Sequence, residues 1–376
     1  MQKSKPRAAE EIFLVVFFLA AVSVPLGLLL VRGEGKAAWE NRKLAELPAR
    51  PRTPRDVYHL PPKLSEYFKD HFGLRAELIR WQATAKMDWL RTSGSPQVLL
   101  GREGWLFHAG EREVEMYTGA DPFTPQGLEV WGRYLQGLGS WAEGRGASFV
   151  VAFVPEKQTI YPELMPGGLA RGRGASRQDQ LIEYLKGRPG VRFVDLRPAV
   201  AEAKGGAQVY MRTDTHWNQL GSFAAYGALA RELGRDFPGV RPSPLSDYEV
   251  RQEQFSGDLA GMLGLRGVIW ESVPRLRPKG APRARFEGDC NDVGVCSSEA
   301  EGEGLPRVLM FRDSAAAFFI PFLAEHVSRG VYVWDTSWSF PTELLERERP
   351  DVVVLEMVER NLMKPPVRPI RAASPR

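Results

Sequence analysis

Two short motifs in this 376-residue chain hold residue types that can perform nucleophilic catalysis. Ser314 stands in RVLMFRDSAAAFFIPFL, directly after an apolar segment that ends at Phe311. Asp214 and His216 stand two residues apart in MRTDTHWNQLG. A serine nucleophile needs a base to take its proton, and the base needs a group that fixes its tautomer. One interpretation of the two motifs is therefore a serine nucleophile with a histidine–aspartate pair.

Each motif also has a simpler interpretation. Asp313 or Ser314 before three alanines is an ordinary helix N-cap. Asp214 could cap the following helix beside a surface histidine. If the segment is extended, however, residues two apart point to the same side, and the Asp214 carboxylate reaches the His216 imidazole. A metal site would need a third ligand that the sequence does not place, so we predict no metal.

The chain offers few candidates for the base, because it has five histidines. His59 falls in a proline-rich stretch, His71 on an early predicted helix, and His326 late in the helix that Ser314 would open. His108 follows a predicted strand and is the one rival to His216.

A third motif, VPEKQTIYPELMP, follows an apolar segment that ends at Val154. Its Lys157, Tyr161 and Glu163 could line a sugar cleft. The alternative is a structural turn bracketed by prolines, with a packed tyrosine.

Apolar runs alternate with helical patterns along most of the chain, which predicts an α/β domain with a mostly parallel sheet flanked by helices. The predicted strands are 98–100, 104–107, 147–154, 191–195, 307–311, 330–334 and 351–355; the predicted helices are 63–91, 126–145, 178–186, 220–233, 315–327 and 341–349. We expect 33–63 to form an extended stalk with turns and 264–304 an irregular insertion. Ser314 would then lie at the carboxyl end of a strand, where open α/β sheets place their active crevices, beside a helix N-terminus that can stabilise an oxyanion.

Residues 12–31 are twenty consecutive uncharged residues, long enough to cross a bilayer. Lys3, Lys5 and Arg7 precede them, so the positive-inside rule leaves 1–11 as a basic cytoplasmic N-terminus and the body outside the cytoplasm. The alternatives are a signal peptide cleaved near Ala21-Val22-Ser23 and a buried helix of a soluble protein.

Cys290 and Cys296 are the only cysteines, and the sequence CNDVGVC suits a local disulfide in an oxidising compartment. The alternative is two free thiols in a loop.

The net charge of +4 comes from the two ends of the chain. Without residues 1–32 and the basic, proline-rich tail 364–376, the body holds 42 basic and 44 acidic residues. A nucleic-acid-binding domain would carry a basic stripe in its body, so we expect no nucleic-acid partner.

Taken in order, several segments resemble the SGNH hydrolase-like domain of the alginate O-acetylation proteins of the AlgJ/AlgX type. The similarity runs from about residue 39 to 361 and rests on these pieces: ENRKLAELP, YFKDHFGLR, GREGWLF, VPEKQTIYPELMP, QLIEYL, VDLRP, DTHWN, SGDLAGML, FRDSAAAF and VVVLEMVERNL. The chain departs from standard SGNH enzymes in having Arg312-Asp313 before the serine, where those enzymes have Gly-Asp.

The resemblance implies a permuted SGNH-type domain over 96–363, after an anchor at 12–31 and a stalk with a helical lead-in at 32–95. It implies Ser314 as nucleophile, His216 as base and Asp214 as the residue orienting His216. For binding the substrate we predict Lys157, Tyr161, Trp217 and Arg312.

The function implied is a single-pass, membrane-anchored polysaccharide O-acetyltransferase on the periplasmic side of the inner membrane, working through an acetyl-enzyme and without a cofactor. Its partners would be an exported polysaccharide and a multi-spanning membrane O-acyltransferase that passes on the acetyl group. Two other functions stay open: a carbohydrate esterase or deacetylase with the same triad, and a non-catalytic polymer-binding assembly protein.

Overall fold

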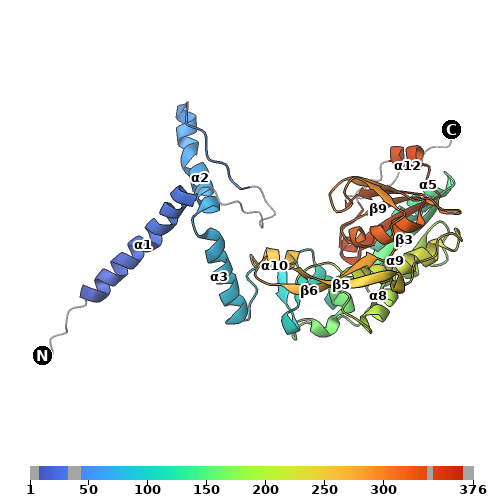
Figure 1. The fold of residues 1–376 in the computed structure, drawn as a ribbon, viewed down its shortest axis with the longest axis horizontal. Coiled ribbons are helices and arrows are strands. Elements are labelled where there is room, and N and C mark those ends of the chain that lie inside the picture. Colours follow the sequence, from blue (N-terminus) through green and yellow to red (C-terminus); the bar gives the residue numbers. More distant parts are fainter. Residues whose placement is uncertain (1–7, 33–43, 337–341, 367–376) are drawn as a thin grey trace. The chain divides into compact units, whose positions relative to one another are not determined.

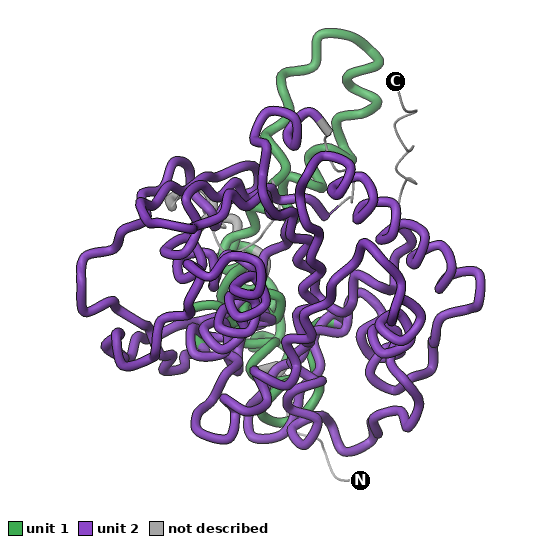
Figure 2. Tube along the Cα trace, turned by 90° about the vertical axis from the view of Figure 1, so that its right-hand side faces the viewer, with its two compact units in different colours: residues 1–95, 260–268 green, residues 96–259, 269–376 purple. Residues whose placement is uncertain are grey.

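The computed structural model describes residues 8–32, 44–336 and 342–366. Parts of the predicted cytoplasmic segment (1–7), stalk (33–43) and tail (367–376) lie outside these ranges. The chain divides into two compact units, one of residues 1–95 with 260–268 and one of 96–259 with 269–376 (Figure 2).

The first unit holds α1 (Ala8–Arg32), α2 (Pro54–His71) and α3 (Arg75–Asp88). The stalk prediction is wrong for 54–63, which is helical. Thr53 and Asp56 form a capping box there and Pro54 occupies the first turn, a combination that starts a helix despite the prolines that follow. Among the described residues, no helix is both long and apolar enough to span a bilayer. The predicted anchor is therefore not confirmed.

The second unit is built on a seven-stranded sheet in the order β4-β3-β11-β9-β10-β8-β7. Its five strands from β4 to β10 are parallel, whereas β8 and β7 are antiparallel to their neighbours. Two antiparallel pairs, β1-β2 and β5-β6, lie outside it. The strands are β1 (Val98–Leu100), β2 (Leu106–His108), β3 (Ser148–Val154), β4 (Arg192–Asp195), β5 (Tyr248–Phe255), β6 (Glu271–Pro278), β7 (Arg285–Glu287), β8 (Val295–Glu299), β9 (Arg307–Arg312), β10 (Arg329–Trp334) and β11 (Val352–Val358).

Helices cover both faces of the sheet (Figure 1). Alternate residues of β3, β9 and β11 face opposite ways, and both sets are buried because each packs on a helical layer. One layer includes α5 (Pro125–Glu143), α7 (Arg177–Leu185) and α12 (Thr342–Glu348), and the other includes α8 (Arg197–Lys204), α9 (Gln219–Leu233) and α11 (Ile320–Leu323). Shorter helices are α4 (Glu113–Thr118), α6 (Lys157–Ile160) and α10 (Asp258–Met262). The predicted α/β class with a mostly parallel sheet is confirmed.

Two predicted elements differ from the structure. The stretch 264–304 contains β6, β7 and β8, so it is not an irregular insertion. The helix predicted over 315–327 is broken into a 3₁₀ turn (Ala315–Phe318), α11 and a second 3₁₀ turn (Ala324–His326). Pro321 explains the first break, because it has no N–H to bond the carbonyl of residue 317, and it lies in the first turn of α11, where proline is tolerated.

Candidate active site

Ser314 lies just beyond the carboxyl end of β9, in the middle of the sheet. It is partly exposed, and among the described residues its backbone N–H has no hydrogen-bond partner. The four-residue 3₁₀ turn that follows is not the helix we expected, and the Asp313 carboxylate accepts the Ala315 N–H at 3.0 Å. The Ser314 N–H is thus a free donor beside the nucleophilic oxygen.

Asp313 itself is buried and holds the nucleophile loop against the centre of the sheet. Its second oxygen accepts the Val358 N–H at 2.9 Å and the Asn361 amide at 3.0 Å, while its own N–H donates to Glu356 at 2.9 Å. Burial, reinforced by the charge of Asp313, raises the pKa of Glu356 well above its usual range. The loop before Ser314 is therefore fixed by strand β11 and the residues after it.

Asp214 and His216 lie in a tight loop between Tyr210 and Trp217, which form an isolated β-bridge. The Asp214 Oδ1 atom accepts the backbone N–H of His216 at 2.9 Å and the imidazole Nδ1–H at 2.7 Å. An aspartate that bonds the backbone two residues on makes a local turn. The two side chains meet because of this turn, rather than the extended segment we expected.

The three predicted catalytic side chains form one hydrogen-bonded chain. His216 Nε2 lies 2.8 Å from Ser314 Oγ, on the ring edge opposite the nitrogen that bonds Asp214. With Nδ1 donating to the carboxylate, Nε2 is left as an acceptor for the serine proton. Phe318 stacks on the imidazole at a centroid distance of 5.2 Å. The arrangement can activate a serine oxygen for attack on an acyl carbonyl.

The charges of the site raise the pKa of His216 and so make it a stronger base. Burial acts to lower the pKa of His216, but the hydrogen bond to Asp214 and the negative charges of Asp214 and Asp258 raise it above its usual value. Burial acts to raise the pKa of Asp214, and its contacts with His216 outweigh this and lower it.

Lys157, the first residue of α6, binds the loop of residues 211–216 that carries Asp214 and His216. Its ammonium donates to the carbonyl oxygens of Met211 (2.8 Å), Arg212 (3.2 Å) and Asp214 (2.6 Å). Burial lowers the pKa of this lysine to about 8. Three carbonyls occupy all three N–H groups, so Lys157 suits a structural clamp rather than the substrate contact we predicted.

The other predicted substrate-binding residues are also buried. Tyr161 is 5% exposed and its hydroxyl accepts the Val209 N–H; Trp217 is 1% exposed and donates to the Ala315 carbonyl. Arg312 is 0% exposed, donates to backbone carbonyls of residues 292 and 313, and lies over the Trp334 ring. Side chains so enclosed support the site from inside the protein.

Glu163, the third side chain of that predicted sugar cleft, lies on the protein surface. Its carboxylate pairs with Lys204 at 2.6 Å.

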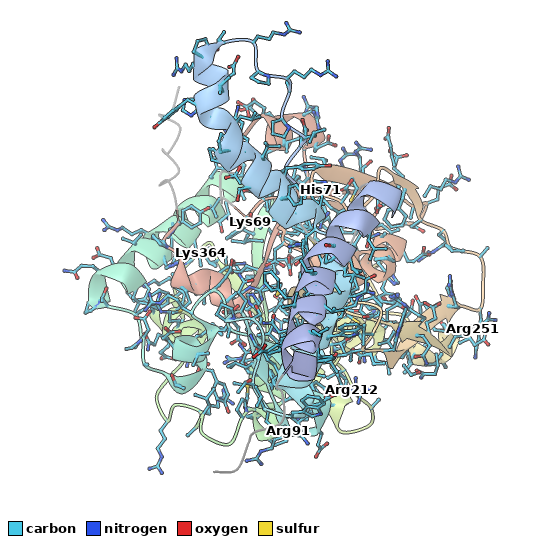
Figure 3. All side chains as sticks on the ribbon, turned by 90° about the vertical axis from the view of Figure 1, so that its left-hand side faces the viewer. Lys69, His71, Arg91, Arg212, Arg251 and Lys364 are labelled. Atoms are coloured by element: carbon cyan, nitrogen blue, oxygen red, sulfur yellow. A yellow bond between two sulfur atoms is a disulfide. The ribbon has the colours of Figure 1, made fainter. Side chains whose placement is uncertain are left out.

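Two acidic residues that the sequence analysis did not select complete the loop's support. Glu271 on β6 accepts the Thr213 N–H at 2.7 Å and the Arg212 N–H at 2.7 Å (Arg212 is labelled in Figure 3). Asp258 accepts the Thr215 N–H at 2.8 Å and its hydroxyl at 2.6 Å. Asp258 belongs to SGDLAGML, one of the segments that carry the family resemblance. Its place in that segment is the feature of the sequence that could have identified it as a site residue.

His108, the rival base, is paired elsewhere. Its Nδ1 contacts the buried Glu113 carboxylate. Arg360 links this pair to Glu156, because its guanidinium lies 3.9 Å from the Glu113 carboxylate and 2.7 Å from that of Glu156. Arg360, Glu156 and His216 all line one small recess of about 10 Å³. His108 therefore belongs to a neighbouring ion-pair network.

Within the described ranges, one group of side chains has the spacing of a metal site: Asp214, His216 and Asp258, with ligand atoms within 4.8 Å of one another. Asp258 supplies the third side chain of this spacing, which the sequence did not place. All three side chains are already engaged in the hydrogen bonds given above, so we assign no metal to them.

Cys290 and Cys296 are joined by a disulfide with an S–S distance of 2.03 Å. It closes the turn between β7 and β8, on the sheet edge beyond β10.

Residues 98–282 match the family model of the SGNH hydrolase-like domain of acetyltransferase AlgX. The chain is 28% identical over 278 residues to the probable alginate O-acetylase AlgJ of Pseudomonas putida, covering 71% of this chain and 68% of that one. It is also 28% identical over 260 residues to the protein of the same name from Pseudomonas aeruginosa, covering 66% and 61%.

A solved structure of a DHHW family protein from Eubacterium siraeum has the same fold, with a TM-score of 0.51 at 15% identity, covering 72% of this chain and 96% of that one. The resemblance stated from the sequence is confirmed.

Proposed function

Starting from this resemblance to the SGNH hydrolase-like domain of the alginate O-acetylation family, we propose that the protein is a polysaccharide O-acetyltransferase. The observation that carries the proposal is the chain of hydrogen bonds from Ser314 through His216 to Asp214, at 2.8 and 2.7 Å. The two Pseudomonas relatives are named as probable alginate O-acetylases, which supports acetyl transfer. The polymer acetylated by this chain is an exported polysaccharide.

The reaction has two halves. His216 Nε2 takes the Ser314 proton as Oγ attacks the acetyl carbonyl of the donor, and the Ser314 N–H is positioned to donate to the oxyanion. The donor's leaving group departs with the proton from His216, which leaves an acetyl ester on Ser314. His216 then deprotonates a sugar hydroxyl, whose oxygen attacks that ester, and the proton returns to Ser314. Asp214 stabilises the imidazolium in both halves.

The location follows from the same proposal. Residues 12–31 anchor the chain, and the body works on the periplasmic side of the inner membrane. Acetyl-CoA is cytoplasmic, so a multi-spanning membrane O-acyltransferase supplies the acetyl group. The Cys290–Cys296 disulfide supports an oxidising compartment.

The test is acetyl trapping on the full chain in membranes that contain the partner acyltransferase. We expect an acetyl group on the Ser314 peptide by mass spectrometry, its loss in Ser314→Ala and His216→Ala, and faster discharge by an acceptor oligosaccharide than by water. Ser272→Ala is the matched control, because Ser272 is exposed on the β5-β6 hairpin.

Each alternative function has its own signature in this experiment. An esterase would discharge the acetyl group to water and never to sugar. Full polymer acetylation by Ser314→Ala would overturn the catalytic assignment and favour an assembly protein.

A further inference from the structure

One partly buried carboxylate beside His216 has no part in the proposed reaction. We propose that Asp258 is a positioning residue of the Ser314–His216–Asp214 site, which locks the Asp214 carboxylate in place and holds a second negative charge beside His216. The inference rests on the proposed function and adds to it a residue without which the base would be weaker.

The first support is a reciprocal set of hydrogen bonds between two loops. The backbone N–H of Asp258 donates to Asp214 Oδ2 at 2.8 Å, on the oxygen that His216 does not use. In return, the Asp258 carboxylate accepts both the N–H and the hydroxyl of Thr215, the residue between Asp214 and His216. Asp214 therefore cannot rotate without breaking the contacts of Asp258.

The second support is the close packing of the loop at Gly257 against the loop at Thr213 and Asp214, which leaves no room for a side chain at residue 257. Gly257 donates its N–H to the Thr213 hydroxyl at 3.0 Å. A Cβ atom at Gly257 would lie 2.3 Å from the Thr213 carbonyl oxygen and 2.6 Å from the Asp214 Cβ atom. Only a glycine lets the two backbones come this close, which brings the Asp258 N–H to Asp214.

The third support is the charge environment. Both donors to the Asp258 carboxylate come from the neutral Thr215, so its negative charge is not neutralised by these bonds. The charged groups that face His216 are Asp214, Asp258 and Arg360, with Glu156 on the same recess. Burial and then the charge of Asp214 raise the pKa of Asp258, while Asp258 raises that of His216. A charge held here favours the imidazolium that forms when His216 takes the serine proton.

The test is an NMR titration of the His216 ring in the full chain in detergent micelles, with His216→Ala to assign its signal. Asp258→Asn keeps the backbone N–H and one of the two side-chain oxygens, which can still accept the Thr215 N–H, and removes the charge. We expect the His216 pKa to fall in Asp258→Asn and to be unchanged in Asp247→Asn, an exposed aspartate on the surface. Formation of acetyl-Ser314 should slow about tenfold, because a weaker base takes the proton less readily.

The outcomes separate this inference from the proposed function. An unchanged His216 pKa in folded Asp258→Asn overturns the inference, even if Ser314→Ala is inactive and the proposed function stands. Acetylation by Ser314→Ala overturns the proposed function itself. If Asp258→Asn does not fold, Thr215→Val serves instead, since it removes one anchor of Asp258: slower acetylation supports the inference and the wild-type rate overturns it.

Discussion

At the scale of single residues, the site depends on buried charges whose partners are backbone groups. Lys157 is the clearest case, because its ammonium donates hydrogen bonds to three backbone carbonyls of the Asp214 loop that would otherwise need water. Burial makes the charged form of this lysine costly, as its lowered pKa shows, but removing the side chain would leave buried carbonyl groups without a donor.

We expect Lys157→Met to lower the free energy of unfolding by about 3 kcal/mol, since buried carbonyls would lose their donor. The Asp214 loop would loosen, and acetylation of Ser314 should fall at least tenfold, about 1.4 kcal/mol of barrier. Urea unfolding and acetyl trapping measure the two effects. Lys186→Met is the control, because Lys186 is exposed and makes only a 3.5 Å surface pair with Glu183. Equal free energies of unfolding of the two variants would contradict the structural role of Lys157.

Residue chemistry could be predicted from the sequence where the chemistry is local. Asp214 and His216 are two residues apart, and Ser314 ends an apolar strand pattern, so their roles could be proposed before the structure. The role of Lys157 could not, because its three partners lie 54 to 57 residues further along the chain. Asp258 was missed for the same reason, being 44 residues from Asp214.

At the scale of elements, the strands that position the triad were the easiest to predict. β3, β9 and β11 are buried on both faces, and a continuous apolar run marks such strands in a sequence. β6 and β7 carry arginines, glutamates and, in β6, prolines, which edge strands tolerate. Such residues interrupt the hydrophobic pattern by which a strand is predicted from a sequence. That is why 264–304 was predicted as irregular.

The close approach of the loops at Gly257 gives an element-scale prediction. Gly257→Ala should lower the free energy of unfolding by about 1–3 kcal/mol, because the new methyl group meets backbone atoms that cannot easily move. Separation of the loops should also reduce Ser314 acetylation. Gly280→Ala is the matched control, since a Cβ atom there meets nothing within 4 Å. Thermal unfolding and acetyl trapping compare the two variants. If Gly257→Ala changed neither stability nor acetylation, the loops would have room to separate.

At the scale of the whole molecule, the disulfide reinforces the antiparallel end of the sheet. Cys296 lies on β8, which pairs with β10, and Arg312 beside the nucleophile donates to the carbonyl of Asp292 within the closed turn. The bond therefore stabilises an edge that is connected to the site by hydrogen bonds.

We expect the Cys290→Ser, Cys296→Ser double variant to be less stable by about 2 kcal/mol, the loop-closure value for a short ring. The oxidised wild-type protein treated with a reductant should show the same loss in a urea titration, whereas the double variant should not respond to the reductant. A reductant effect of equal size on both would show that the stabilisation does not come from this bond.

The strand order has a consequence for how the molecule is made. β11, the last strand of the described chain, lies between β3 and β9 in the interior of the sheet, and Asp313 beside the nucleophile is held by Val358 and Asn361. Synthesis starts at the N-terminal end, so the central layer of the sheet cannot close until β11 has been made. A chain interrupted before Val352 lacks an interior strand of its own sheet and the residues that hold Asp313 beside the nucleophile.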